Sequence, residues 1–301
     1  NMRLCERNCM QIKDKVLDVP VIQGGMGVGV SLSSLAGAVA ANGACGVISS
    51  VNAGYDEQDF KSSPFKANLR ALDYHIKRAK QIAAESTKKG LVAVNIMTAV
   101  SHYEESCKTA VSAGADIIML PYFKSAKEVE IFIQYVGGRA RVLPLVETPE
   151  AVRCIDEILL LDGLDEIFVG LNDLSLGYEK KFMFELLADG TLEMLCLKFR
   201  QKGIPFGFGG IASLGKGMLP SEYIIREHYR LESTCAILSR SFCRTDMVKD
   251  LNEIRHIFET GLPEIRALEK ECEKYSAYFR KNRKEVVKKI RVICQESGEE
   301  K

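Results

Sequence analysis

The stretch ADIIMLPYFKSAKEVEIFIQYVGGRARVLPLVETPEAV, residues 115–152, decides the fold. Two short apolar runs, 115–120 and 141–146, flank a segment, 125–136, in which apolar residues recur every three to four positions. Short runs rich in Val, Ile and Leu are typical of buried parallel strands, and the pattern between them is typical of an amphipathic helix. The stretch therefore predicts a β-α-β unit with two parallel strands.

The same alternation continues along most of the 301 residues. Six further apolar runs lie at 20–24, 45–49, 91–96, 165–170, 204–208 and 234–239, and helix-like segments lie at 31–42, 64–87, 101–113, 149–160, 180–202 and 220–231. Eight strand-helix repeats predict an α/β protein with a single closed (β/α)8 TIM barrel. We assign residues 1–16 to an N-terminal extension, 17–245 to the barrel and 246–301 to a C-terminal helical extension, which either closes the barrel as a solvated helix or contacts another subunit.

Composition narrows the range of functions. The 41 basic and 40 acidic residues nearly cancel, which argues against a nucleic-acid partner. The sequence has no apolar run long enough to cross a membrane, so we expect a soluble, cytoplasmic protein that acts on a small molecule. None of the ten cysteines forms a CxxC pair, so reduced and mostly buried thiols are expected, and a metal site at Cys5 and Cys9 is disfavoured.

Two acidic residues follow neighbouring predicted strands. Glu147 comes directly after the run 141–146, and Asp173 comes shortly after the run 165–170. Glu147 could cap the next helix or pair with a basic side chain, and Asp173 could be an N-cap or turn residue. Because catalytic groups of this fold lie where strands end, the two carboxylates together favour a Mg²⁺ or Mn²⁺ site.

Glycines and a cation follow the last two strands. Gly209 and Gly210 leave backbone N–H groups open to an anion, or they allow close packing at a barrel corner. Arg240 could bind a phosphate or a carboxylate, or pair with an acid. The loops after strands seven and eight are the usual phosphate site of this fold.

The first three strands carry a different set of residues. Gly24 and Gly25 expose backbone next to the apolar Met26, and Asn95 ends the third strand. The spacing of GGMGVG differs from the dinucleotide-binding pattern, so that reading is weak. Of the four histidines, His102 could reach the rim and transfer a proton, whereas His75, His228 and His256 lie in helical segments and are expected at the surface.

Residues 17 to about 115 resemble the nitronate monooxygenase and enoyl-acyl-carrier-protein reductase II family of FMN barrels. The resemblance rests on PVIQGGMGVGVSLSSLAGAVAANGACGVIS, VNAGYDEQDF and GLVAVNIMTAVSHYEESCKTAVSAGADII. It implies that Gly24, Gly25 and Met26 lie against a flavin ring and that Asn95 binds the same cofactor. Gly209 and Gly210 would then hold the FMN phosphate. The glycine-rich His segment that this family places after strand six is replaced here by LNDLSLGYEKK.

Residues from about 115 to 285 resemble the HpcH/HpaI aldolase and citrate lyase family, in its capsule-biosynthesis-associated branch. The resemblance rests on residues 115–152 and on GLDEIFVGLNDLSLG, FMFELLADGT and GIPFGFGGIASLGKG. It implies that Glu147 and Asp173 bind the metal and that backbone amides of Gly170, Leu171 and Asn172 hold the carboxylate of a 2-oxo acid. The His and Arg that this family carries on strands two and three are absent, and the half-barrels meet near 115–120.

Three functions follow from the two resemblances. The first is a metal-dependent carbon–carbon lyase that acts on a 2-oxo acid or its aldol adduct through a metal-stabilised enolate, with Arg240 near the substrate and His102 or a metal-bound water moving the proton. The second is an FMN-dependent oxidoreductase. The third is a folded mosaic barrel with little activity. The acid pair is complete within one half of the chain, which favours the lyase.

Overall fold

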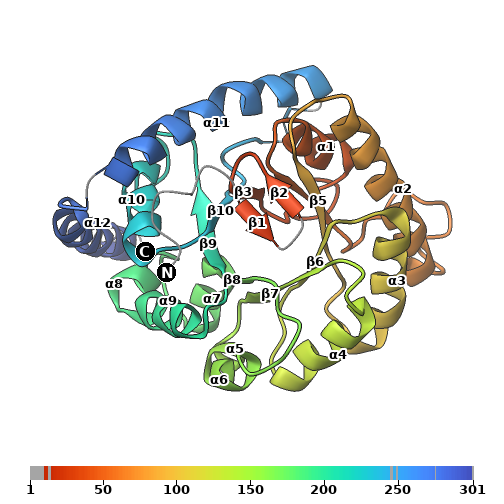
Figure 1. Ribbon diagram of the computed structural model, residues 1–301, viewed down its shortest axis with the longest axis horizontal. Helices are drawn as coiled ribbons and strands as arrows, with labels where there is room; N and C mark the ends of the chain where they lie inside the picture. Colours follow the sequence, from red (N-terminus) through yellow and green to blue (C-terminus); the bar gives the residue numbers. More distant parts are fainter. Residues whose placement is uncertain (1–9, 13–14, 245–246, 249, 275, 300–301) are drawn as a thin grey trace.

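The eight predicted strands form a closed parallel barrel with helices around it. The computed structural model describes residues 10–12, 15–244, 247–248, 250–274 and 276–299 (Figure 1). The barrel order is β10-β3-β4-β5-β6-β7-β8-β9, and every neighbouring pair is parallel. The strands are β3 (Val21–Gln23), β4 (Cys45–Ser49), β5 (Leu91–Asn95), β6 (Ile117–Leu120), β7 (Arg141–Val146), β8 (Ile167–Gly170), β9 (Phe206–Ile211) and β10 (Cys235–Leu238). The (β/α)8 prediction is therefore confirmed.

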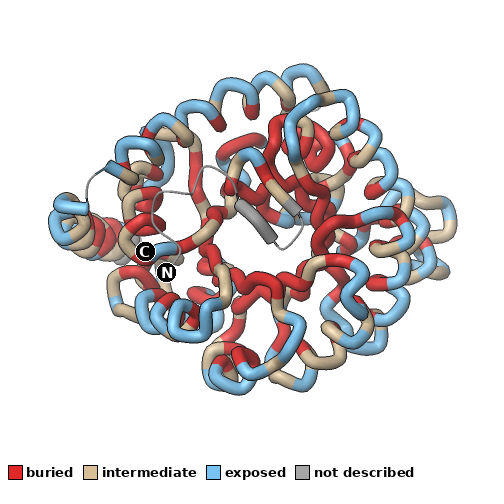
Figure 2. Tube along the Cα trace, viewed as in Figure 1, coloured by how far each residue is buried: buried red, intermediate tan, exposed pale blue. Residues whose placement is uncertain are grey.

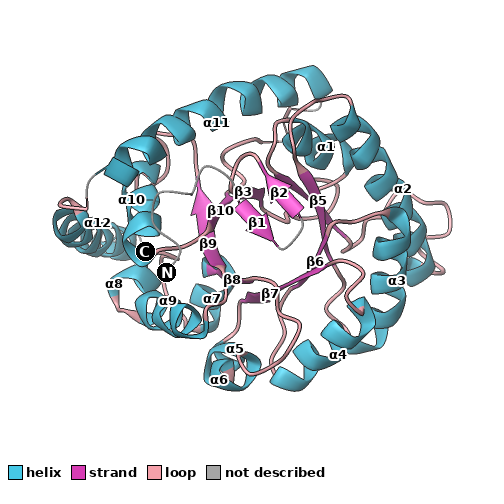
Figure 3. Cartoon of the chain, in the orientation of Figure 1, coloured by secondary structure: helices cyan, strands magenta, loops and turns pink. Residues whose placement is uncertain are grey.

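The helices form a ring outside the strands (Figure 3). They are α1 (Ser33–Ala41), α2 (Pro64–Ala84), α3 (Tyr103–Ala113) after the short 3-10 turn η2 (Val100–His102), α4 (Ala126–Val136), α5 (Pro149–Arg153), α6 (Ile155–Ile158), α7 (Leu171–Gly177), α8 (Glu185–Ala188), α9 (Thr191–Lys202) and α10 (Ser221–Leu231). Two further helices, α11 (Leu251–Lys274) and α12 (Phe279–Glu299), form the C-terminal extension. Helix α11 packs on α1 and α10, and α12 packs on α10 and α8.

Local sequence signals set the ends of the helices. The Ser125 hydroxyl accepts a hydrogen bond from the Glu128 N–H and so caps α4. The Glu128 carboxylate accepts hydrogen bonds from the Ser125 hydroxyl and the Lys124 N–H, which fixes the first turn of the helix. It ends at Gly137, whose φ of 58° is the left-handed conformation that glycine adopts freely. Thr148 accepts from the Ala151 N–H, and Pro149 occupies the first turn of α5. Thr148 therefore caps α5, which leaves Glu147 free for another role.

The hydrophobic core has two layers. Side chains such as Ile22, Val47, Met119 and Phe168 fill the inside of the barrel. A larger layer of apolar side chains lies between the outside of the strands and the helices. In Figure 2 the strands are accordingly coloured red, as buried residues. The inner layer makes the barrel a packed core, so open space for chemistry lies at its ends.

A short hairpin lies at one end of the barrel and was not predicted. Strands β1 (Met10–Ile12) and β2 (Lys15–Leu17) pair antiparallel, and Figure 1 shows them in front of the barrel strands. Leu17 is buried among the inner side chains, and the Asp18 N–H donates to the Lys89 carbonyl just before β5. The hairpin therefore covers the end where the strands begin and leaves the opposite end for the site. No described helix is both long and apolar enough to span a lipid bilayer.

Candidate functional site

The predicted acid pair lies at the end of the barrel where strands finish. Val146 of β7 is paired with Val169 of β8, so Glu147 and Gly170 follow side by side. A Cβ atom on Gly170 would lie 2.5 Å from Glu147 Cγ, so a side chain there would displace the carboxylate. Asp173 lies in the first turn of α7, directly after β8. The two strand ends thus bring the carboxylates to one part of the rim.

Glu147 is held in an environment that disfavours its negative charge. Burial raises its pKa to about 8, and the charge of Asp173 adds to the rise, while a hydrogen bond from the Tyr122 N–H acts in the opposite direction. That bond joins Tyr122 N to Glu147 Oε2 at 2.9 Å. Within the described parts of the chain, no lysine or arginine pairs with Glu147. A basic partner therefore does not explain this residue, whereas a divalent cation would offset both unfavourable effects.

Tyr122 is a site residue that the sequence reading missed. It follows β6 and Pro121, and its φ of 56° is the left-handed conformation, which is uncommon outside glycine, Asn and Asp. Its ring is 50% exposed, and the Lys124 ammonium lies 5.6 Å from the ring centroid. The usable signal was the end of the fourth strand, LPYFK, because each strand end of a barrel contributes to the rim.

The predicted carboxylate-binding backbone lies at the start of α7. Gly170 precedes the helix, and Leu171 and Asn172 are its first residues. The first N–H groups of a helix have no partner within it, so they can receive an anion. The Asn172 side chain donates to Asp173 Oδ1 at 3.3 Å. These amides lie beside the acid pair, at the position where the resemblance to the aldolase family places the carboxylate of a 2-oxo acid.

Residues of the predicted flavin half are also close together. A Cβ atom on Gly25 would lie 2.1 Å from Asn95 Nδ2, so the loop after β3 packs on the end of β5. The Met26 N–H and the Gln23 side chain both donate to the Ser31 hydroxyl, which fixes this loop next to Gly24. The buried Asn95 Oδ1 has no hydrogen-bond partner among the described residues. An unpaired buried acceptor of this kind is suited to a ligand donor.

The two glycines expected in a phosphate loop lie within a strand. Strand β9 extends to Ile211, three residues beyond the predicted end, and therefore includes Gly209 and Gly210. A Cβ on Gly209 would lie 2.8 Å from Ile237 Cβ, and one on Gly210 would lie 3.1 Å from Ser239 Cβ. Close packing on β10 thus accounts for both glycines. Arg240 is exposed, and its guanidinium would lie 3.8 Å from a Cβ on Gly27.

The histidines differ from one another in burial. His102 is half-buried at the end of η2, and its ring stacks on Phe65 with centroids 4.1 Å apart. His228 was expected at the surface, and that expectation is wrong: it is buried, stacked on Phe208, and its Nδ1 lies 2.6 Å from the Ser233 hydroxyl. His75 is half-buried and His256 is exposed.

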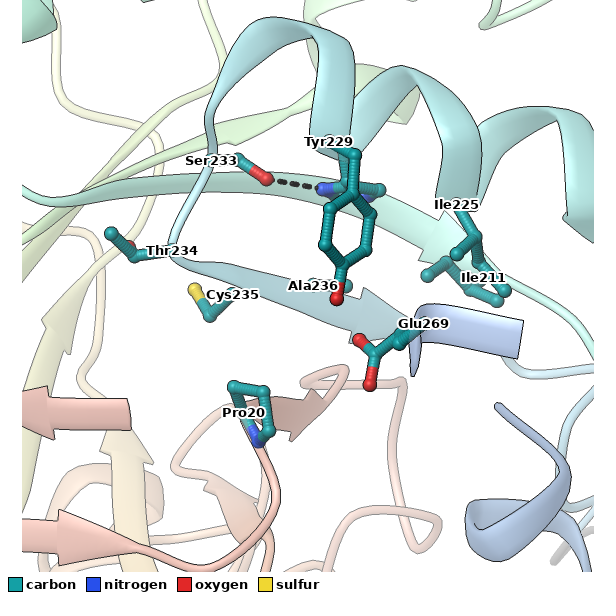
Figure 4. Close-up of a pocket in the computed structure, with 10 residues that line it drawn as sticks. Pro20, Ile211, Ile225, Tyr229, Ser233, Thr234, Cys235, Ala236 and Glu269 are labelled. Carbon is teal, nitrogen blue, oxygen red and sulfur yellow. Dashed lines mark hydrogen bonds between the residues drawn. The ribbon is translucent and has the colours of Figure 1, made fainter. Parts of the chain in front are cut away.

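A separate hollow lies near the other end of the barrel. It is bordered by Pro20 before β3, Thr234 before β10, and Tyr229 and Glu269 on the helices outside (Figure 4). These residues precede their strands or lie outside the barrel, so the hollow is not part of the acid-pair site.

Eight described cysteines are free and buried or half-buried, as expected, and Cys5 and Cys9 lie outside the described residues. In the described chain no three His, Cys, Asp or Glu side chains gather as a metal site, so water and substrate would complete the coordination of an ion at Glu147 and Asp173.

Comparisons with known proteins recover both resemblances. The nitronate monooxygenase family model matches residues 10–154, a little under half of the chain. The match extends beyond the expected limit near residue 115 and includes Glu147. No curated protein matches.

Several solved structures are similar to the chain. An HpcH/HpaI aldolase/citrate lyase family protein from Burkholderia cenocepacia J2315 has 13% identity and a TM-score of 0.55, and the alignment covers 79% of this chain and 95% of that one. An HpcH/HpaI aldolase from Desulfitobacterium hafniense DCB-2 has 15% identity and a TM-score of 0.53, and the alignment covers 79% of this chain and 92% of the aldolase. FabK from Thermotoga maritima has 15% identity and a TM-score of 0.45, with 75% and 59% covered. At these identities the likeness shows the fold, a TIM barrel related in structure to the aldolase barrels and matched over its first half by the nitronate monooxygenase family model.

Proposed function

We propose that the protein is a metal-dependent carbon–carbon lyase acting on a 2-oxo acid or its aldol adduct. The observation that carries the proposal is Glu147, a carboxylate placed beside Asp173 with a pKa raised to about 8. Such an arrangement is unfavourable in the empty site and favourable with a divalent cation present. The similarity to HpcH/HpaI proteins, which are named as aldolases or citrate lyases, supports the same assignment.

Each residue of the site has a role in this proposal. Glu147 and Asp173 hold Mg²⁺ or Mn²⁺, which when bound supplies Lewis-acid polarisation of the substrate carbonyl. The Tyr122 N–H fixes one oxygen of Glu147, and Gly170 leaves room for its side chain. The amides of Gly170, Leu171 and Asn172 receive the substrate carboxylate. Arg240 and His102 remain predicted substrate and proton-transfer groups, respectively.

Metal binding and proton exchange test the proposal without knowledge of the natural aldehyde. Titration with Mn²⁺, followed by the electron paramagnetic resonance of the free ion, should show one site that is lost in Glu147→Ala and Asp173→Asn. Glu150→Ala is the matched control, because Glu150 is an exposed acid three residues away that pairs with Arg153. Loading with Mn²⁺ should also speed exchange of the pyruvate methyl protons in D₂O. Unchanged binding in Glu147→Ala would remove the basis of the proposal.

A second candidate is an FMN-dependent oxidoreductase. It is favoured by the unpaired Oδ1 of Asn95 beneath Gly25 and by the match to the nitronate monooxygenase family model. It requires flavin absorbance in the purified protein, or its appearance on addition of FMN, with loss in Asn95→Ala. A third outcome, metal or flavin binding without turnover, would indicate a mosaic barrel with little activity.

A further inference from the structure

The outer face of α12 carries a row of exposed cations. We call this row the basic stripe; its members are Arg280, Lys281, Lys284, Lys288 and Arg291. Successive members are one, three, four and three positions apart, so they lie on one side of the helix. The opposite side buries Asn282, Val286 and Ile290. The stripe is therefore a continuous surface that faces away from the barrel.

The stripe lacks the counter-charges that other helices of the protein provide. Lys77 lies 2.7 Å from Asp73 on α2, and Arg230 of α10 lies 2.8 Å from Glu193. Even Arg283, on the flank of α12, lies 3.8 Å from Glu193. By contrast, no cation of the stripe makes an ion pair or a side-chain hydrogen bond with any described residue. Like charges at these spacings cost a few tenths of a kcal/mol per pair, so the stripe is unfavourable for the isolated chain.

Apolar groups lie among the cations. Val287 lies on one flank of the stripe and Val292 on the other, and Val292 is 44% exposed. Both line a shallow hollow along the helix, together with Lys284, Lys288 and Arg291. A partner that fits this surface therefore offers negative charge and a small apolar contact together.

The edge of the stripe limits the width of the partner. Glu285 and Glu296 follow Lys281 around the helix on the same flank, so the positive surface is about one helix wide. A broad anionic surface, such as a lipid bilayer or duplex DNA, would meet these acids as well. Lys281 and Arg291 are ten residues apart, which is about 15 Å along the axis. The surface is thus narrow, straight and periodic.

We propose that the basic stripe of α12 is a docking surface for an acidic amphipathic helix of a partner protein. Acidic side chains at i, i+3 or i+4, and i+7 on such a helix would match the three-four-three spacing of the cations. Apolar residues on either side of the acids would contact Val287 on one flank and Val292 on the other, as in other complexes in which two helices lie side by side. This surface is outside the acid-pair site, so the inference does not depend on the proposed function.

A defined peptide tests the inference. The probe is a fluorescein-labelled helical peptide of about 20 residues with Glu at the matching positions and Leu between them. Its fluorescence anisotropy should report saturable binding that weakens with salt. Lys284→Glu, Lys288→Glu and Arg291→Glu combined should weaken binding at least tenfold. The control reverses three exposed charges elsewhere, Lys61→Glu, Lys66→Glu and Lys202→Glu, and should stay within twofold of the unsubstituted protein.

The comparison probes decide between partners. A peptide of identical composition with its acids spread around the helix should bind at least tenfold more weakly than the patterned one. Equal binding of the two peptides, or equal loss in both triple variants, would reduce the effect to general charge attraction and overturn the proposal. Tighter binding of a single-stranded oligonucleotide or of phosphatidylserine vesicles, lost in the stripe variant, would also overturn it. Circular dichroism checks that both variants keep their helices.

Discussion

The affinity of the protein for Mn²⁺ should depend steeply on pH through Glu147. A proton and a cation compete for this carboxylate, whose pKa is raised from its ordinary value of 4.5 to about 8. With that pKa, about half of the molecules carry an ionised Glu147 at pH 8 and about 1% at pH 6. The dissociation constant should therefore rise about 50-fold between pH 8 and pH 6, which equals about 2.3 kcal/mol of binding free energy.

The stability of the metal-free protein should change in the opposite direction. Because folding raises the pKa of Glu147, the folded state holds this proton more tightly than the unfolded state. The contribution of Glu147 to the free energy of unfolding is therefore fully present below pH 4.5 and is lost as the pH rises towards 8. A bound cation removes this loss, so Mn²⁺ should raise the unfolding midpoint more at pH 8 than at pH 6.

Isothermal titration calorimetry in two buffers with different heats of ionisation measures both the affinity and the protons released. About half a proton should leave the protein per Mn²⁺ bound at pH 8, and about one at pH 6. Glu147→Gln cannot ionise, so its residual Mn²⁺ binding should be weak and nearly constant over this range. Equal affinity at pH 6 and pH 8, or a full pH dependence in Glu147→Gln, would refute the assignment of Glu147 as a ligand.

Three other substitutions test the structure around the site and in the core. Glu166 accepts hydrogen bonds from Thr234 and Cys235 inside the barrel, and burial raises its pKa to about 7. The free energy of unfolding of the unsubstituted protein, measured with urea, should therefore fall by on the order of 2 kcal/mol between pH 5 and pH 8. Glu166→Gln has no carboxyl group to titrate, so it should not show this fall. Gly170→Ala places a Cβ 2.5 Å from Glu147 Cγ and should weaken Mn²⁺ binding about tenfold in a calorimetric titration, with little change in the unfolding midpoint. Gly46→Ala places a Cβ 2.0 Å from the carbonyl oxygen of Ala36 on α1, so it should lower the free energy of unfolding by about 3 kcal/mol and lower the Tm. An unchanged Tm would contradict the close contact of β4 with α1.

Much of the fold could be predicted because each strand is a separate local signal. The runs at 45–49 and 141–146 coincide with β4 and β7, since buried parallel strands are short, apolar and followed by polar loops. Glu147 could be placed at the rim for the same reason. The expectation that Asp173 lies near Glu147 followed from the order of strands in a barrel, and in the structure the charge of Asp173 raises the pKa of Glu147.

Other features depend on contacts that no local pattern contains. Helix α7 was not predicted because seven residues are too few to be helical alone, and it is stabilised by burial of Leu171 and Leu174. Strand β9 continues beyond residue 208, although its two glycines resemble a loop in sequence, because Gly209 pairs with both neighbouring strands and Ile211 pairs with Leu238 of β10. Gly210 lies at an irregularity in the register between these pairs. His228 lies on a helix rich in polar residues, and the Phe208 ring on which it stacks comes from β9, a separate segment of the chain.

Asn95 and Glu147 each have an unfavourable free energy in the empty protein, and the cost is larger at Glu147, which supports the metal proposal. Leaving the buried Asn95 Oδ1 without a donor costs about 1–3 kcal/mol, which a water molecule could remove. Raising the pKa of Glu147 from 4.5 to about 8 corresponds to about 5 kcal/mol against the charged form, and neutral water does not offset the charge of Asp173. The proposed divalent cation at Glu147 and Asp173 therefore has more electrostatic support than the proposed flavin.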